Sequence, residues 1–253
     1  MTRNLAEEMT RALTELYLST MQAQYEEVSR QATAETWGYA DYLLELAQRE
    51  CQQRREKRTE RVLKRSKLSL AKSWAALDLK RLPAKVVQQL RGLMSGDFLD
   101  RRENVLVFGP PGSGKTHCLS AVAQELIRSG RRVWFTTCSL LVQDLLAAKR
   151  DYTLKALLKR LDHWEGVILD DLGYVQQNRE EMEVLFTFLA ERYERGSVLL
   201  TSNLAFSKWE QIFKDPMTTA AAVDRLVHHS VIVELNIPSY RVESAKRTKP
   251  TEG

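Results

Sequence analysis

The chain has 253 residues, of which 43% are apolar and 28% are charged, and its formal net charge is +5. This length permits one full α/β domain with a smaller appendage, and the composition excludes a mainly disordered chain. The first eight residues include two acids where a signal peptide needs an apolar run, and no window approaches the ~18 apolar residues of a membrane span. We therefore expect a cytoplasmic protein without a membrane segment.

Two amphipathic helices are predicted at the start of the chain. Apolar residues recur at three- and four-residue steps from Leu5 to Tyr17, which predicts a helix that extends to about Arg30. A second helix is predicted from near Thr36, with an apolar face that ends at Cys51. Residues 52–61 contain no apolar side chain, so the second helix should run on through solvent beyond its core.

The positive charge is concentrated in residues 49–67. Nine bases and three acids give this segment a local charge of +6, so the rest of the chain sums to −1. A helix would place four arginines within roughly 60° of one another, and a stripe of this kind suits contacts with DNA phosphates rather than with base edges. From the residues alone, a solvated charged helix is an equally good interpretation. The predicted DNA-binding residues are the four of the stripe, Arg54, Arg58, Arg61 and Arg65, together with Arg55 and Lys64.

The pattern changes near residue 104. Residues 66–103 predict a connector with a helix near 84–94, and after them short apolar runs alternate with helical stretches. Continuous apolar runs of this length indicate parallel strands that are buried on both faces. We predict an α/β fold with a five-stranded parallel sheet, preceded by a small all-helical domain, with domain limits of 1–70 and 71–245 and a disordered tail at 246–253. The predicted strands are 104–108, 133–136, 166–170, 197–201 and 231–235.

Neither the cysteines nor the histidines predict a metal site. Cys51, Cys118 and Cys138 show neither a CxxC pair nor the spacing of a zinc site, so we expect three small buried side chains. His228 and His229 are adjacent and diverge on a helix, so they cannot chelate one ion as an i, i+4 pair could.

A phosphate-binding loop is predicted at residues 109–116, which match G-x-x-x-x-G-K-[ST] between a predicted strand and a predicted helix. Its glycines permit backbone angles that turn successive N–H groups toward phosphate oxygens, and the helix adds the positive end of its dipole. Lys115 is expected to contact the β and γ phosphates of ATP, and the Thr116 hydroxyl to ligate Mg²⁺. The predicted nucleotide-binding residues are Gly109, Pro110, Pro111, Gly112, Ser113, Gly114, Lys115, Thr116 and His117.

Polar residues at two predicted strand ends supply the remaining candidates. We assign Asp170 to the magnesium ion and Asp171 to polarising the attacking water, because one carboxylate cannot easily serve both tasks. Strand-end acids are also common as helix caps. Asn203 follows another strand on the same side of the sheet and could orient water, although a turn asparagine is an equally good interpretation.

Taken together, six segments closely resemble the IstB family: 109–116, 169–174, 192–197, 201–203, 224–229 and 239–241. That family comprises the ATP-binding helper proteins of insertion-sequence transposases, within the AAA+ group beside the helicase loader DnaC. The resemblance implies a P-loop ATPase that forms homo-oligomers with ATP on duplex DNA and recruits a transposase. It also implies roles for three residues: Asn203 as sensor 1, Arg225 as an arginine finger that reaches a neighbouring subunit's nucleotide, and Arg241 as the sensor 2 arginine.

Two positions depart from the family's pattern. Most AAA+ proteins carry Glu where this chain has the shorter Asp171, which predicts slow hydrolysis. Residues 237–238 are Ile-Pro where Gly-Glu is expected, which puts the position of Arg241 in question.

Two other functions fit parts of the sequence. A helicase loader like DnaC would act on single-stranded DNA, but no aromatic stacking platform surrounds the basic segment. A small-molecule kinase would also use the phosphate loop, but no arginine-rich lid is evident and the basic helix has no place in that scheme.

Overall fold

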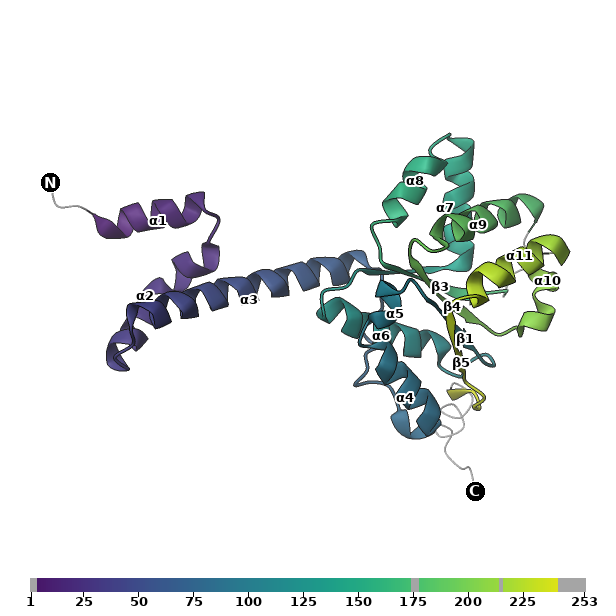
Figure 1. Cartoon of the computed structure of the whole chain (residues 1–253), viewed down its shortest axis with the longest axis horizontal. Coiled ribbons are helices and arrows are strands. Elements are labelled where there is room, and N and C mark those ends of the chain that lie inside the picture. Colours follow the sequence, from purple (N-terminus) through teal and green to yellow (C-terminus); the bar gives the residue numbers. More distant parts are fainter. Residues whose placement is uncertain (1–3, 174–177, 214–215, 241–253) are drawn as a thin grey trace, which may run out of the picture. The chain divides into compact units, whose positions relative to one another are not determined.

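The computed structural model describes residues 4–173, 178–213 and 216–240 (Figure 1). The chain forms two compact units, Met1–Arg61 and Val62–Gly253. The predicted domain limits at 1–70 and 71–245 remain our proposal for where the DNA-binding and ATPase functions divide. The predicted tail at 246–253 and Arg241 lie outside the described residues.

The second unit is built on the predicted five-stranded sheet, which is confirmed. All strands are parallel, in the order β2-β3-β4-β1-β5. Because β1 lies between β4 and β5, the loop that follows β1 begins at the carboxyl edge of the sheet with a strand on either side. The strands are β1 (Asn104–Phe108), β2 (Val133–Thr137), β3 (Gly166–Leu172), β4 (Ser197–Ser202) and β5 (Ser230–Glu234).

Successive side chains of each strand point to opposite faces of the sheet and pack into two separate cores. Leu106 and Leu169 point into one core, whereas their neighbours Val105 and Ile168 point into the other. Helices cover both faces of the sheet, as Figure 1 shows. The first core is covered by α7 (Cys138–Arg150), α8 (Leu154–Leu161), α9 (Arg179–Arg192), α10 (Glu210–Phe213) and α11 (Pro216–Val227). The second is covered by α4 (Ala84–Leu93), α5 (Asp97–Asp100) and α6 (Lys115–Arg128).

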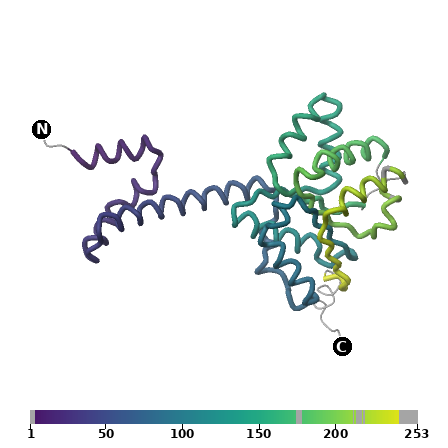
Figure 2. Tube along the Cα trace, viewed as in Figure 1, coloured from purple at the N-terminus to yellow at the C-terminus, as the bar shows by residue number. Residues whose placement is uncertain are grey.

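The first unit contains α1 (Leu5–Glu15), α2 (Ser19–Ala34) and most of α3 (Tyr39–Arg65) (Figure 2). The single helix predicted to extend to Arg30 is wrong, because the chain breaks between α1 and α2. Tyr17 adopts a left-handed φ of 56°, and the Leu18 amide donates to the Leu13 carbonyl, which is the bonding of a Schellman helix end. Apolar spacing continues across this break, so periodicity alone could not reveal it.

Glu50 joins α2 to α3 within the first unit. Its Oε2 accepts hydrogen bonds from the Thr20 and Met21 amides at 2.8 and 3.2 Å, and its Oε1 accepts one from Arg54 at 2.8 Å. Burial alone would raise the pKa of Glu50, but the hydrogen bonds from Arg54 and the two amides outweigh it and lower the pKa. The carboxylate therefore serves as the missing cap at the start of α2.

Two of the three cysteines are buried as predicted, and burial raises the pKa of Cys118 to about 12. The prediction is wrong for Cys51, which is exposed because it lies where α3 leaves its packed face. Among the helices in the described ranges, none combines the length and the apolar character needed to cross a bilayer.

Candidate nucleotide-binding site

The phosphate loop joins β1 to α6. Gly114 has a φ of 96° and stands immediately before Lys115, the first residue of α6. Gly112 has a φ of 79°, and a Cβ added there would come within 2.1 Å of the Ser239 hydroxyl. Both positions need a glycine, Gly112 for its backbone angle as well as for the close approach of the C-terminal segment.

Lys115 is buried inside its own loop. The ammonium donates hydrogen bonds to the carbonyls of Gly109 at 2.9 Å and of Pro110 at 3.1 Å. Only 6% of the residue is exposed, so the ammonium is enclosed by the loop that the sequence predicts to bind phosphate.

A hydrogen-bonded network links the loop to the strand-end acids. Thr116 Oγ1 donates to Asp170 Oδ1 at 2.9 Å, and Thr201 Oγ1 donates to the same oxygen at 2.7 Å. Asp170 is 5% exposed, and this burial raises its pKa although the hydrogen bonds from Thr201 and Thr116 act in the opposite direction. The structure thus brings together the two residues predicted to hold magnesium.

Asp171 is set apart from Asp170 by an irregularity in β3. The register of β3 with β4 shifts between Leu169 and Leu172, and Asp171 has a left-handed φ of 61°. Its amide donates to Thr201 Oγ1 at 2.9 Å, and its residue is exposed where Asp170 is buried. One acid therefore faces the loop threonine while the next is open to solvent at the same edge of the sheet.

Thr201 was missed by the sequence reasoning. Its hydroxyl accepts from the Asp171 amide and donates to Asp170, so it fixes both acids at once. A signal was present, since Thr201 is a polar residue near the end of a buried strand. Asn203 follows one residue after β4, is exposed, and lies beside the loop because β4 pairs with β1.

The connector before β1 was predicted, but its contacts with α6 were missed. It runs along α6, where Gln124 donates to the carbonyls of Ser69 and Lys72, both at 3.0 Å. His117 Nε2 lies 3.0 Å from the Ser73 carbonyl, so this predicted nucleotide-binding residue contacts the connector. The positive charge of Lys72 acts to lower the pKa of Asp170, one of the two residues predicted to hold magnesium.

The chain returns to the phosphate loop after β5. The Tyr240 amide donates to the Gly112 carbonyl at 2.9 Å, and Arg81 donates to the Pro238 carbonyl at 3.2 Å. The segment before Arg241 is therefore packed on the loop, although Arg241 itself lies outside the described residues.

Arg225 lies at the opposite end of the sheet. Asn104, the first residue of β1, donates from Nδ2 to the carbonyls of Arg225 at 3.2 Å and of Leu226 at 3.1 Å. The phosphate loop begins after the last residue of β1, and five residues of strand span ~13 Å. The Arg225 guanidinium instead lies over the Phe186 ring, 4.8 Å from its centroid. The structure therefore does not bring Arg225 to the loop of its own chain.

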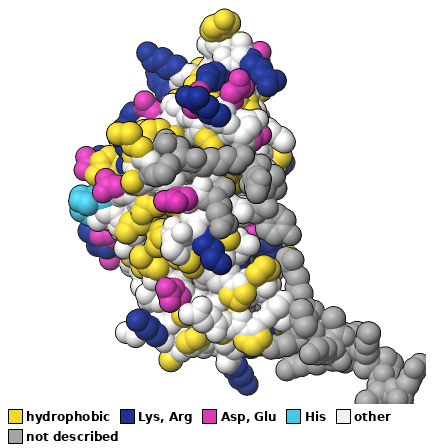
Figure 3. Space-filling model, turned by 90° about the vertical axis from the view of Figure 1, so that its right-hand side faces the viewer, with side chains coloured by type: hydrophobic (Ala, Val, Ile, Leu, Met, Phe, Trp, Pro, Cys, Tyr) yellow, Lys and Arg dark blue, Asp and Glu magenta, His cyan; other side chains and the backbone are white. Residues whose placement is uncertain are grey.

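The basic residues of α3 differ in their contacts. Arg54 is tied into the first unit, because besides Glu50 it contacts the Tyr17 carbonyl at 2.6 Å. Arg58 and Arg61 are exposed. On the face drawn in Figure 3, by contrast, Lys and Arg side chains mix with Asp and Glu between hydrophobic patches, so that face presents no single sign of charge.

Comparison with known proteins assigns the family. The model described as IstB-like ATP binding protein matches residues 11–248. The chain belongs to this family. Among IstB-like relatives, a putative insertion sequence ATP-binding protein of Sinorhizobium fredii is 39% identical over 242 residues, covering 95% of this chain and 81% of the relative.

Solved structures show the same fold as this IstB-like chain. AMPPCP-bound DnaA from Aquifex aeolicus matches with a TM-score of 0.57 at 14% identity, over 74% of this chain and 58% of DnaA. The DnaC helicase loader matches with a TM-score of 0.53 at 16% identity, over 61% of this chain and 89% of the loader. These two structures share the fold of the chain, and the family match describes it as an IstB-like ATP-binding protein.

Proposed function

We propose that the chain is an ATPase that binds ATP with Mg²⁺, forms homo-oligomers on duplex DNA and assists the transposase of an insertion sequence. This proposal is supported by the positions of the site residues at two opposite ends of the sheet. The phosphate loop and the two acids lie at the carboxyl edge of the sheet, whereas Arg225 is held at the amino edge by Asn104. A site completed by a second subunit accounts for both positions.

Within one subunit, the residues present fit a nucleotide with its metal ion. The Thr116 hydroxyl and the Asp170 carboxylate, 2.9 Å apart, would hold the ion, which neutralises charge on the β and γ phosphates. Lys115 would exchange its two loop carbonyls for phosphate oxygens. Asp171, exposed at the same edge, would accept a proton from the attacking water, and Asn203 would orient that water.

Between subunits, Arg225 would stabilise the charge that develops on the neighbour's γ phosphate. Hydrolysis would then depend on assembly, and ATP held between subunits would stabilise the oligomer. The experiment is to mix Lys115→Ala protein with Arg225→Ala protein, each inactive alone. ATPase activity should return, because some interfaces pair an intact loop with an intact Arg225. Failure to recover activity would refute a finger that acts in trans.

DNA binding is proposed for the part of α3 that the fold leaves exposed. Arg58→Ala with Arg61→Ala should weaken duplex binding and reduce the salt slope of log K by about 1 for each cation removed. Arg11→Ala with Arg30→Ala removes two exposed charges from α1 and α2 and serves as the control. Equal losses in both pairs would contradict this interface. Tighter binding to single strands than to duplex would favour a helicase loader like DnaC.

The transposase is proposed as the partner because the S. fredii relative is named an insertion sequence ATP-binding protein.

A further inference from the structure

A cavity of about 560 Å³ in the second unit shares no lining residue with the nucleotide site. It lies beside the edge strand β2, between the last turn of α3, α7 and α8. Its floor is apolar and formed by side chains that are at most 9% exposed: Trp134, Leu141, Leu157 and Leu161.

Cations surround this apolar floor. The lining contains four Lys and Arg residues, Arg65, Lys67, Arg132 and Arg160, against one acid, Asp144. Within the described ranges, Arg65 and Arg160 form no ion pair. Like charges around one hollow repel each other, so the arrangement is complementary to an anionic partner.

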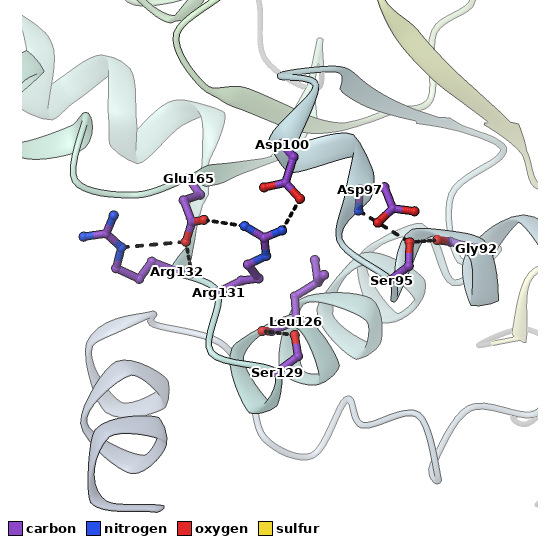
Figure 4. A network of polar contacts seen from close by, with 9 residues as sticks. All are labelled: Gly92, Ser95, Asp97, Asp100, Leu126, Ser129, Arg131, Arg132 and Glu165. Carbon is purple, nitrogen blue, oxygen red and sulfur yellow. Dashed lines mark hydrogen bonds and ion pairs between the residues drawn. The ribbon is translucent and has the colours of Figure 1, made fainter. Parts of the chain in front are cut away.

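Arg132 is oriented by a neighbouring network. Figure 4 shows Arg131 and Arg132 approaching Glu165 from opposite sides, with Arg131 also contacting Asp100. The Arg132 side chain lies 3.7 Å from the Glu165 carboxylate and remains 47% exposed. Its charge is therefore only partly neutralised at the rim of the cavity.

We propose that this cavity docks an acidic peptide segment of a partner protein, with a large apolar side chain in the hollow and carboxylates at the rim. Duplex DNA offers phosphates but no apolar group to fill the floor. A nucleotide base would stack on an aromatic face, but the Lys67 ammonium lies over the Trp134 ring, 5.2 Å from its centroid, and the other indole of the lining, Trp164, is partly buried against the apolar core. A peptide supplies both the charge and the apolar anchor.

The test uses peptides selected from a random display library on the full-length protein and resynthesised with a fluorescent label. We expect acidic sequences with a Leu or aromatic anchor, whose affinity falls at least tenfold in Lys67→Glu/Arg160→Glu protein. The matched control is Lys155→Glu/Lys159→Glu, which reverses two exposed charges on α8, the helix of Arg160, outside the cavity lining and should leave affinity unchanged. Selected peptides without acids, equal losses in both pairs, or displacement by a mononucleotide but not by unlabelled peptide would overturn the proposal.

A second, independent observation concerns Asn104. The residue is 9% exposed and uses both ends of its amide, since Oδ1 accepts from the Val198 amide at 2.9 Å while Nδ2 donates to the Arg225 and Leu226 carbonyls. These carbonyls lie in the last turn of α11, where the carbonyls of a helix have no hydrogen-bond partner within the helix itself. The geometry assigns Asn104 as the positioning residue for Arg225, an assignment that rests on the proposed action of Arg225 in trans.

Subunit mixing tests this assignment. Asn104→Ala is placed either in the Lys115→Ala subunit, which donates Arg225, or in the Arg225→Ala subunit, which donates the loop. Recovered ATPase should fall about tenfold or more only in the first arrangement, because a misplaced group loses catalysis while the fold persists. Equal loss in both arrangements, or none in either, would overturn the assignment. If the mixture without Asn104→Ala recovers nothing, the proposed function fails instead.

Discussion

Replacing Thr201 with valine should remove the hydrogen bonds that hold Asp170 and Asp171 in place. Valine has the same shape but no hydroxyl, so the Asp171 amide loses its acceptor and Asp170 loses its donor at 2.7 Å. Leaving a buried partner unsatisfied costs about 1–3 kcal/mol, and Thr201 is fully buried. With two partners affected, the free energy of unfolding should fall by about 2–6 kcal/mol.

The effect on activity should exceed the effect on stability. Asp171 holds a left-handed φ of 61°, a conformation that costs about 1–3 kcal/mol and that the bond to Thr201 helps to maintain. Without that bond the carboxylate should leave its position, and kcat should fall by about 10²-fold. Urea unfolding and steady-state phosphate release measure the two effects, and Thr201→Ser, which keeps the hydroxyl, is the control. Wild-type kcat in Thr201→Val protein would refute the network's role.

Three further changes test other parts of the site and the fold. Burial raises the pKa of Asp170, so its contribution to stability is present at low pH and is lost as the pH rises through that pKa. Without nucleotide at pH 8, Asp170→Asn protein should therefore have a higher melting temperature than wild type, and this difference should close on acidification. The variant should gain no stability from Mg²⁺ and ATP. A margin independent of pH would contradict this. Gly112→Ala should weaken ATP binding at least tenfold by displacing Ser239, whereas Gly92→Ala, with open space at its Cβ, should not. Arg192→Met should lower the free energy of unfolding by about 3 kcal/mol or more, because the buried guanidinium donates to four carbonyls. Arg195→Met, at an exposed ion pair, should lower it by less than about 1 kcal/mol in the same urea titration. Equal losses would disprove the structural role of the buried Arg192.

The parts of the fold that were predictable are those that local sequence encodes. Strands buried on both faces require continuous apolar runs, so all five strands could be located, with β1 matching at both ends. The spacing of Gly112, Gly114 and Lys115 reflects backbone angles and a charge that the loop itself needs. Asp170 was predictable because a carboxylate immediately after an apolar strand is conspicuous.

The remaining features depend on tertiary contacts. The break at Tyr17 leaves apolar spacing intact, so a periodic pattern runs straight through it. Thr201 gains its importance from the register shift in β3, a different strand. The separation of Arg225 from the loop follows from the hydrogen bonds that join the end of α11 to Asn104, and a contact between positions so far apart in the chain is not readable from a single sequence.

Under the proposed function, bound nucleotide reports assembly on DNA. It is tested most directly by particle mass, measured with ATP, ADP or a slowly hydrolysed analogue, each with and without a short duplex. We expect the mass to grow beyond that of the monomer with ATP or the analogue in the presence of duplex, and this growth to reverse with ADP. A mass that stays that of the monomer under all six conditions would contradict it.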